Sequence, residues 1–346
     1  MKRPKIDMMN SDLASSLDEF VRLRNTSIVD GESIKAFIET ISDELKDRVK
    51  NPIFIHGHHV QSMFAYIAAT LGQCDLINEE DNGLFLYDDD NDMRRPDFRM
   101  HTRNGEQFLV EVKSNHKNAL TPFKFKTSYI HSLQRYARCL NIPLYFAIYW
   151  SQLKIWTLIN ANYFDALGEH IQLPFEKAMI RNEMSLIGDY LIGTVPPLSL
   201  RLYADPSYPS SIDDNGFVNF KIKRVCMCAD NKEIISRNEE HIAWILMLLG
   251  NWTNVQTPAR IENKQLIYFD IEVHPECFDN NNDFQLLGSV SRIISKEYIR
   301  LTTKGNSIKQ LMPNTKLSNI REVIPHDYHG TVLRLWRFIP KPAKIV

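Results

Sequence analysis

Two short charged motifs lie on either side of a predicted turn in this chain. Pro96-Asp97 precedes Asn104-Gly105, and Glu111-Val112-Lys113 follows it. Asn-Gly between two apolar-rich runs is a strong signal for a β-hairpin, so two antiparallel strands are expected here. Side chains two positions apart in a strand share a face, which places Glu111 and Lys113 together and Val112 on the opposite, core-facing side. The hairpin should bring Asp97 alongside them.

Two carboxylates and an ammonium on one pair of strands suit hydrolysis assisted by a divalent cation. Mg²⁺ prefers oxygen ligands. A neighbouring lysine can orient the attacking water, help to deprotonate it, or stabilise the charge that develops on a phosphoryl group. The residues themselves leave these three roles of Lys113 open. The alternative is a surface hairpin that carries ordinary charged positions.

Pro96-Asp97 together with Glu111-Val112-Lys113 resembles the motif of the PD-(D/E)XK nuclease superfamily, which includes resolvases and restriction endonucleases. The resemblance covers roughly residues 57 to 160. It implies that Asp97 and Glu111 bind Mg²⁺ or Mn²⁺, and that Val112 contributes its backbone carbonyl. It also implies that Lys113 is catalytic.

Two glutamines extend this resemblance. Resolvases of the superfamily place a metal-binding Glu four residues after a Gly on the first helix, and the matching position here is Gln61, after Gly57. A neutral amide brings no charge, so we expect one tightly held ion. In exonuclease members, a Gln on the helix after the Lys lies near the site, and Gln134 matches it, although the Tyr that follows is displaced to Tyr136. A plain helix-surface role for Gln134 is the alternative.

The flanking segments predict an α/β fold with a mixed sheet. Residues 59–71 and 127–140 have apolar residues at helical spacing, and Gly72 is a candidate C-terminal cap. The order helix, three strands, helix, two strands resembles the αβββαβ core of restriction endonucleases. We expect a helical extension over 1–50, this nuclease-like domain over 51–203, and an α+β domain over 217–346 that resembles a winged helix in part.

Several local expectations accompany this division. Helices are predicted over 13–24 and 33–49, the second with Ser33 as its N-cap, and a closing helix over 175–193. The turn-rich stretch 204–216 is a candidate linker or long loop. The acidic stretch 75–92 is predicted to be a solvated loop, in which Asp81 is the residue to test as a further metal ligand.

The charge distribution favours nucleic acid as a partner, although the whole chain has a net charge of only −1. Residues 113–138 contain six Lys and Arg and no Asp or Glu, with aromatic residues between them. Residues 284–346 contain eleven Lys and Arg against three Asp and Glu. Either run could be a merely solvated face. The predicted phosphate contacts are Lys117, Lys124, Lys126 and Arg135 beside the site, and Arg292, Lys296 and Arg300 on one face of a C-terminal helix.

Composition limits the remaining classes. Hydrophobic residues make up 44% of the chain and charged residues 24%, which is typical of a globular protein. We expect no membrane span and no signal peptide, and the five cysteines fit a reducing cytoplasm better than a disulfide framework. A zinc site from Cys226, Cys228, Cys277 and His241 is less favoured than free buried thiols.

The sequence therefore predicts a cytoplasmic, Mg²⁺-dependent endonuclease that hydrolyses phosphodiester bonds, with DNA as the first candidate substrate. Restriction or anti-phage defence is suggested by analogy only, and a homodimer or a partner protein in a defence complex stays open. A repair or recombination nuclease is one alternative. The other is a non-catalytic nucleic-acid-binding or assembly subunit that retains the fold.

Overall fold

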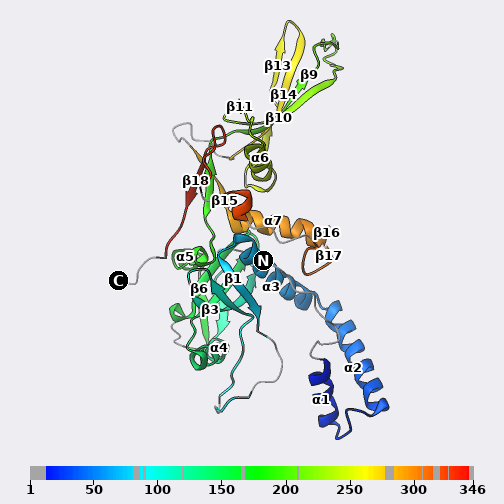
Figure 1. The fold of residues 1–346 in the computed structure, drawn as a ribbon, viewed down its shortest axis with the longest axis vertical. Helices are drawn as coiled ribbons and strands as arrows, with labels where there is room; N and C mark the ends of the chain where they lie inside the picture. The colour runs from blue at the N-terminus through cyan, green and yellow to red at the C-terminus, as the bar shows by residue number, and fades with distance from the viewer. Residues whose placement is uncertain are drawn as a thin grey trace. The chain divides into compact units, whose positions relative to one another are not determined.

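The computed structural model divides the chain into two compact units (Figure 1). The first unit consists of residues 1–187, 298–318 and 341–346, and the second of residues 188–297 and 319–340. This division differs from the expected one, because the boundary lies at Gly188 and the chain returns to the first unit near its end. The structure describes residues 13–80, 86–88, 91–118, 121–164, 168–208, 210–276, 284–305, 307–314, 320–325 and 327–342.

The first unit is built around a mixed five-stranded sheet in the order β1-β2-β3-β5-β6. The strands β1, β2 and β3 form an antiparallel meander, and α4 carries the chain across to β5, which pairs parallel to β3. The order of helices and strands in this sheet is the expected one, but a short strand that was not expected, β4 (Phe123–Lys126), lies between β3 and α4 and pairs outside the sheet. The bounds are β1 Cys74–Glu79, β2 Phe98–Thr102, β3 Gln107–Asn115, α4 Thr127–Leu140, β5 Leu144–Trp150 and β6 Ile155–Asn160.

The β2–β3 hairpin turns at Asn104-Gly105, as the sequence predicts. Gly105 has φ +83°, a conformation that glycine adopts at little cost. Within the hairpin, Phe98 pairs with Val110. This register sets Asp97, which directly precedes β2, beside the middle of β3.

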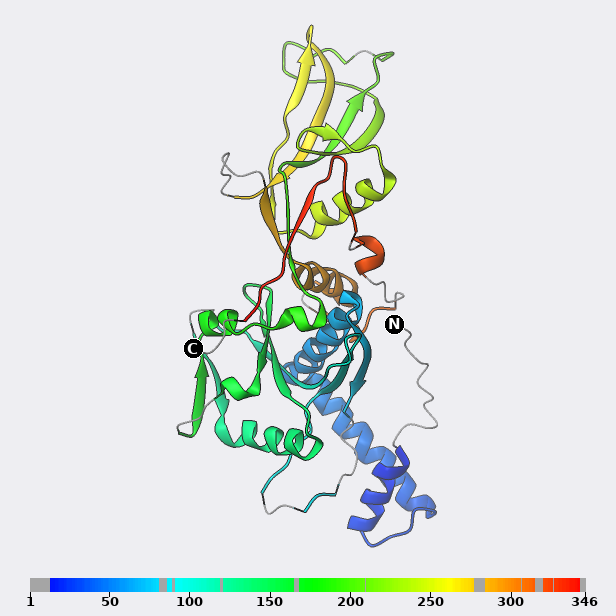
Figure 2. The same ribbon diagram turned by 60° about the vertical axis from the view of Figure 1, so that its left-hand side comes forward.

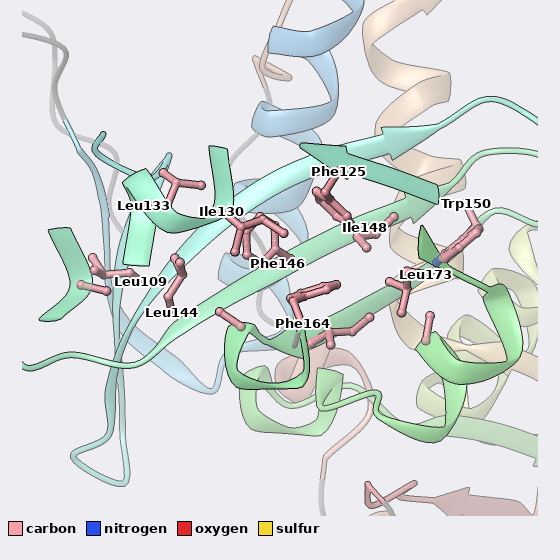
Figure 3. Close-up of a cluster of buried hydrophobic side chains, with 14 residues drawn as sticks. Leu109, Phe125, Ile130, Leu133, Leu144, Phe146, Ile148, Trp150, Phe164 and Leu173 are labelled. Atoms are coloured by element: carbon pink, nitrogen blue, oxygen red, sulfur yellow. The ribbon is translucent and has the colours of Figure 1, made fainter. Parts of the chain in front are cut away.

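Helices cover both faces of this sheet, so β3 is buried almost continuously rather than in alternation. The side chains of Leu109 and Phe146 pack under α4, and Figure 3 shows Ile130 against Phe146. On the other face, Phe64 of α3 (Pro52–Leu71) lies 5.4 Å, between ring centroids, from Trp156. Glu111 therefore shares the α4 face with Leu109, whereas Val112 faces α3.

Helix ends follow the local sequence. Gly72 ends α3 in the left-handed region at φ 74°, as expected. The N-cap of α2 (Gly31–Lys50) is Asp30, whose carboxylate accepts from the amide of Ser33 at 2.9 Å, so the prediction of Ser33 as the cap was wrong. Further elements of the unit are α1 Leu13–Leu23, β4 Phe123–Lys126, β7 His170–Leu173, α5 Phe175–Ile180, β16 Thr303–Lys304 and β17 Ser307–Ile308, and the 3₁₀ turns η1 Ala161–Tyr163 and η2 Met184–Ile187.

The predicted closing helix over 175–193 is mostly not a helix. Only α5 and η2 form there, and β8 (Leu191–Thr194) lies between β15 (Gln285–Ser289) and β18 (Leu335–Phe338). Gly188 has φ 94°, which no right-handed helix accommodates. Pairing with strands distant in sequence decides the conformation of this segment.

Besides the three-stranded sheet of β8, β15 and β18, the second unit contains a larger antiparallel sheet in the order β11-β10-β9-β14-β12, with β13 paired to β14 (Figure 2, light green to yellow). The stretch 204–216 is not a linker between domains, because it connects the neighbouring strands β9 and β10 within this unit. The bounds are β9 Leu198–Ala204, β10 Ile222–Ala229, β11 Lys232–Glu233, α6 Arg237–Leu249, β12 Thr253–Gln256, β13 Ala259–Glu262, β14 Gln265–His274 and α8 Ile320–Val323. The helix α7 (Val290–Thr302) begins in this unit, and its residues from Tyr298 on belong to the first unit.

The winged-helix interpretation of the C-terminal region was wrong. A winged helix needs two helices joined by a short turn. Here α6 and α7 are separated by the four strands from β12 to β15. The helix α7 is buried on most of its surface, with Val290, Ser295 and Tyr298 at 0% exposure.

Candidate active site

Asp97 is held in place by hydrogen bonds from two other segments. Its Oδ2 accepts from the backbone amide of Val112 at 2.7 Å, and its Oδ1 accepts from the side-chain amide of Gln61 at 2.7 Å. Gln61 comes from α3, on the face of the sheet toward which Val112 points. The helix, the strand β3 and the residue before β2 therefore meet at this carboxylate.

Glu111 and Lys113 lie together on β3, as the two-residue spacing predicts. Their side chains form an ion pair, and the Glu111 side chain is only 4% exposed. Tyr129 of α4 completes the group, because its hydroxyl donates to Glu111 and accepts from the Lys113 ammonium at 2.9 Å. The ammonium also lies 4.8 Å from the centroid of the Tyr129 ring.

The pKa values of these groups follow from their burial and mutual charge. Burial, together with the carboxylate of Glu111, raises the pKa of Asp97 to about 7. Burial disfavours the charged form of Lys113, but Glu111, Tyr129 and Asp97 outweigh it and raise its pKa above the ordinary lysine value. Burial and Glu111 also raise the pKa of Tyr129. Lys113 is therefore a persistent cation, and Tyr129 a persistent hydrogen-bond donor.

The acidic stretch 75–92 is only partly the loop that was expected. Asp75 lies on β1, where it pairs with His101 at 2.6 Å. Glu80 has a side chain only 8% exposed, and its carboxylate pairs with Arg99 at 2.8 Å and accepts from the hydroxyl of Tyr136. These partners occupy Glu80, although its amide donates to the carbonyl of Asp97 at 3.0 Å. Asp81 lies outside the described residues.

The structure does not bring Gln134 to this group. Its side-chain amide donates to the carbonyl of Ala161 at 3.3 Å, and it lines a separate cavity with His131 and Arg138. The helix after Lys113 supplies Tyr129 to the site instead. The spacing of charged motifs gave no signal for this residue, since its role depends on α4 packing across β3.

The predicted basic residues are placed differently from one another. Lys117, Lys124 and Lys126 are exposed, and the last two share a face of β4 because Phe125 between them is buried. Arg135 is half-buried, and its guanidinium donates to the carbonyl of Asp92 at 2.8 Å. Sequence reasoning missed Arg94, whose guanidinium lies 5.5 Å from the centroid of the Tyr129 ring.

The predicted cationic face of α7 is not open as expected. The ammonium of Lys296 donates to the carbonyl of Gly250, and Arg292 is half-buried. Arg300 is exposed, but it belongs to the first unit, whereas Arg292 and Lys296 belong to the second. The four-residue spacing correctly placed Arg292, Lys296 and Arg300 on one face of α7. Packing partly buries Arg292 and Lys296, which the spacing could not indicate.

The group offers two carboxylates, Asp97 and Glu111, to a hard divalent cation. Asp97 and Glu111 are buried carboxylates whose proximity raises the pKa of Asp97, and a cation would relieve that repulsion. The described residues contain no group of three or more His, Cys, Asp and Glu that could hold a metal ion. Any ion here would need the backbone carbonyl of Val112 and water to complete its ligands.

Comparison with known proteins adds little. Neither the family models nor the curated proteins searched match the chain. Among solved structures, the chain is similar to Hjc, a Holliday junction resolvase from Archaeoglobus fulgidus, with a TM-score of 0.26 and 12% identity over 32% of this chain and 84% of the resolvase. This is a distant likeness to a nuclease, and at this TM-score it supports no conclusion about individual residues. None of the described helices is both long and apolar enough to cross a bilayer.

Proposed function

We propose that this chain is a metal-dependent nuclease with a restriction-endonuclease-like first unit, and that it hydrolyses phosphodiester bonds of nucleic acid, DNA being the first candidate. The observation that carries the proposal is the convergence of Asp97, Glu111 and Lys113, each fixed by hydrogen bonds from other segments. Mg²⁺ or Mn²⁺, held by Asp97, Glu111 and the Val112 carbonyl, would supply an activated water and neutralise phosphate charge.

Within this proposal Lys113 acts as a cation rather than as a base. Its raised pKa keeps the ammonium charged, and a charged lysine stabilises the extra negative charge of a pentacovalent phosphorane. Tyr129 and Glu111 fix the position of that ammonium. Lys117, Lys124 and Lys126 are the exposed cations proposed to contact the phosphates of the substrate.

Incubation of the purified protein with plasmid, linear duplex and single-stranded DNA and with RNA tests the proposal. Cleavage is expected with Mg²⁺ or Mn²⁺ and not with EDTA. If none of these substrates is cut with either metal, while DNA is still bound, the alternative of a non-catalytic nucleic-acid-binding or assembly subunit replaces this one. Gln61, which stands where a carboxylate is found in resolvases, is the residue that favours this alternative.

Tyr129→Phe is expected to lower the cleavage rate at saturating substrate about tenfold, because it removes one hydrogen bond to each of Glu111 and Lys113. The aromatic ring beneath the ammonium remains, so folding should be preserved. Single-turnover kinetics measure the effect, and KM should be unchanged. A variant that cleaves at the wild-type rate would show that Tyr129 does not position the lysine.

Gln61→Glu is expected to raise the affinity for Mn²⁺ about tenfold, because it adds a third carboxylate beside Asp97. Repulsion between the added carboxylate and Asp97 should lower the melting temperature of the metal-free protein. Isothermal calorimetry and thermal unfolding in EDTA measure the two effects. Unchanged metal affinity would place any bound ion away from Gln61.

A further inference from the structure

A cavity of about 840 Å³ adjoins the candidate active site. Gln61, Val112 and Lys113 belong both to its lining and to the site, so a ligand in the cavity would lie next to the reacting groups. Half of the remaining lining residues are aliphatic. They are Val49, Pro52, Ile53, Ile55, Val60 and Ile308.

Five polar side chains lie among the aliphatic ones, those of Lys50, His56, Ser114, His116 and Ser307. The rings of His56 and His116 lie 4.3 Å apart between centroids, and Ser114 is on β3 two residues after Val112. The Nε2 atom of His56 and the hydroxyl of Ser114 are buried without a hydrogen-bond partner among the described residues. Buried polar atoms without partners destabilise a fold, so a ligand that satisfies them would bind favourably.

The imidazoles of the cavity suit a neutral group rather than an anion, and Lys113, a cation on its wall, is paired with Glu111. Burial lowers the pKa of His56, with His116 adding to the effect, and burial alone lowers that of His116. Both imidazoles are therefore neutral at pH 7. The ammonium of Lys50, which also lines the cavity, lies 3.5 Å from the carboxylate of Asp47.

Gly57 keeps part of this wall free of side chains. It lies in the interior of α3, where glycine lowers helix stability, and its backbone does not require glycine because its φ is not positive. Apart from its chain neighbours and the backbone of its own helix, a Cβ atom at this position would have no heavy atom within 4 Å. The bare backbone therefore leaves room for a group that lies flat against the helix.

We propose that this cavity receives an unpaired nucleobase next to the phosphate that is cleaved, and that the substrate therefore contains single-stranded or unpaired nucleotides. The inference rests on the proposed nuclease function. Bases combine flat apolar faces with a few hydrogen-bonding edge atoms, which match the aliphatic wall, the His56 imidazole and the Ser114 hydroxyl. Because the Nε2 atom of His56 is buried and the His116 ring lies 4.3 Å from the His56 ring, binding of the base requires the exposed His116 side chain to move aside.

Binding of the four deoxynucleoside 5′-monophosphates in EDTA, measured by calorimetry, tests the cavity without any cleavage. The double variant His56→Ala/Ser114→Ala should bind the preferred nucleotide about tenfold more weakly than the wild type. His58→Ala is the matched control, because His58 lies on the same helix against Phe54 and does not line the cavity. Equal affinity of the double variant, no binding by the wild type, or displacement by equimolar inorganic phosphate would each overturn the inference.

A second variant separates loss of binding from loss of folding. Gly57→Leu should fill the cavity at a position where Cβ meets no atom, and it should unfold at the wild-type temperature or above. The expected result is a drop of about tenfold in the ratio of single-stranded to duplex cleavage. Absence of cleavage by the wild type would refute the proposed function. The calorimetric measurement of nucleotide binding would then decide whether the cavity binds a nucleobase. An unchanged ratio of single-stranded to duplex cleavage in an active Gly57→Leu enzyme would refute nucleobase binding in the cavity and leave the proposed nuclease function intact.

Discussion

Alanine at Asp97, Glu111 or Lys113 is expected to lower the cleavage rate by about 10³-fold or more. Each variant removes a charged group that its hydrogen-bond partners Gln61 and Tyr129 cannot replace, because both are neutral. Initial rates on the best substrate, with melting temperatures to verify folding, measure the effect.

Calorimetric titration with Mn²⁺ separates the roles of the three residues. The two carboxylate variants should lose metal binding, whereas Lys113→Ala should keep it, because an ammonium cannot coordinate a cation. Lys177→Ala, an exposed lysine on α5, is the control and should retain full activity. Cleavage at the wild-type rate by Lys113→Ala and Glu111→Ala would eliminate this group of residues as the active site.

Asp97→Asn is expected to abolish cleavage and yet stabilise the metal-free protein above pH 7. The pKa of Asp97 is raised from 3.8 to about 7 by burial and by Glu111, so its contribution to stability is fully present below pH 4 and lost as the pH rises through 7. Asparagine carries no charge, and its side-chain oxygen can still accept from the amide of Val112. If the side-chain amide of Gln61 flips, its oxygen accepts a hydrogen bond from the asparagine nitrogen. The gain should be on the order of 1–3 kcal/mol at pH 8 and near zero at pH 4.

Urea unfolding in EDTA at pH 4, 6 and 8 measures this gain, with Glu176→Gln on the exposed face of α5 as the control. Saturating Mg²⁺ should reduce the gain at pH 8, since the wild-type carboxylate then has a cationic partner. Equal destabilisation of Asp97→Asn at all three pH values would show that Asp97 is not under electrostatic repulsion.

Local sequence was sufficient where neighbouring residues decide the conformation. Asn104-Gly105 predicted the β2–β3 hairpin, and the two-residue spacing placed Glu111 with Lys113. The apolar pattern over 127–140 gave the bounds of α4 without error, and Gly72 marked the end of α3. Each of these features depends on backbone preferences and periodicities within a few residues, so it forms without contacts to distant segments of the chain.

Only the tertiary structure decided features that depend on contacts between distant segments. Leu191–Thr194 became a strand because it pairs with β15 and β18. The ammonium of Lys296 is not available to a phosphate, because it donates to the carbonyl of Gly250. Tyr129 joined Glu111 and Lys113 only because α4 packs across β3. The sequence by itself thus determined the hairpin and the charged residues it carries. Long-range pairing and packing determined which further side chains reach them, because local periodicity holds no information about the partner surface.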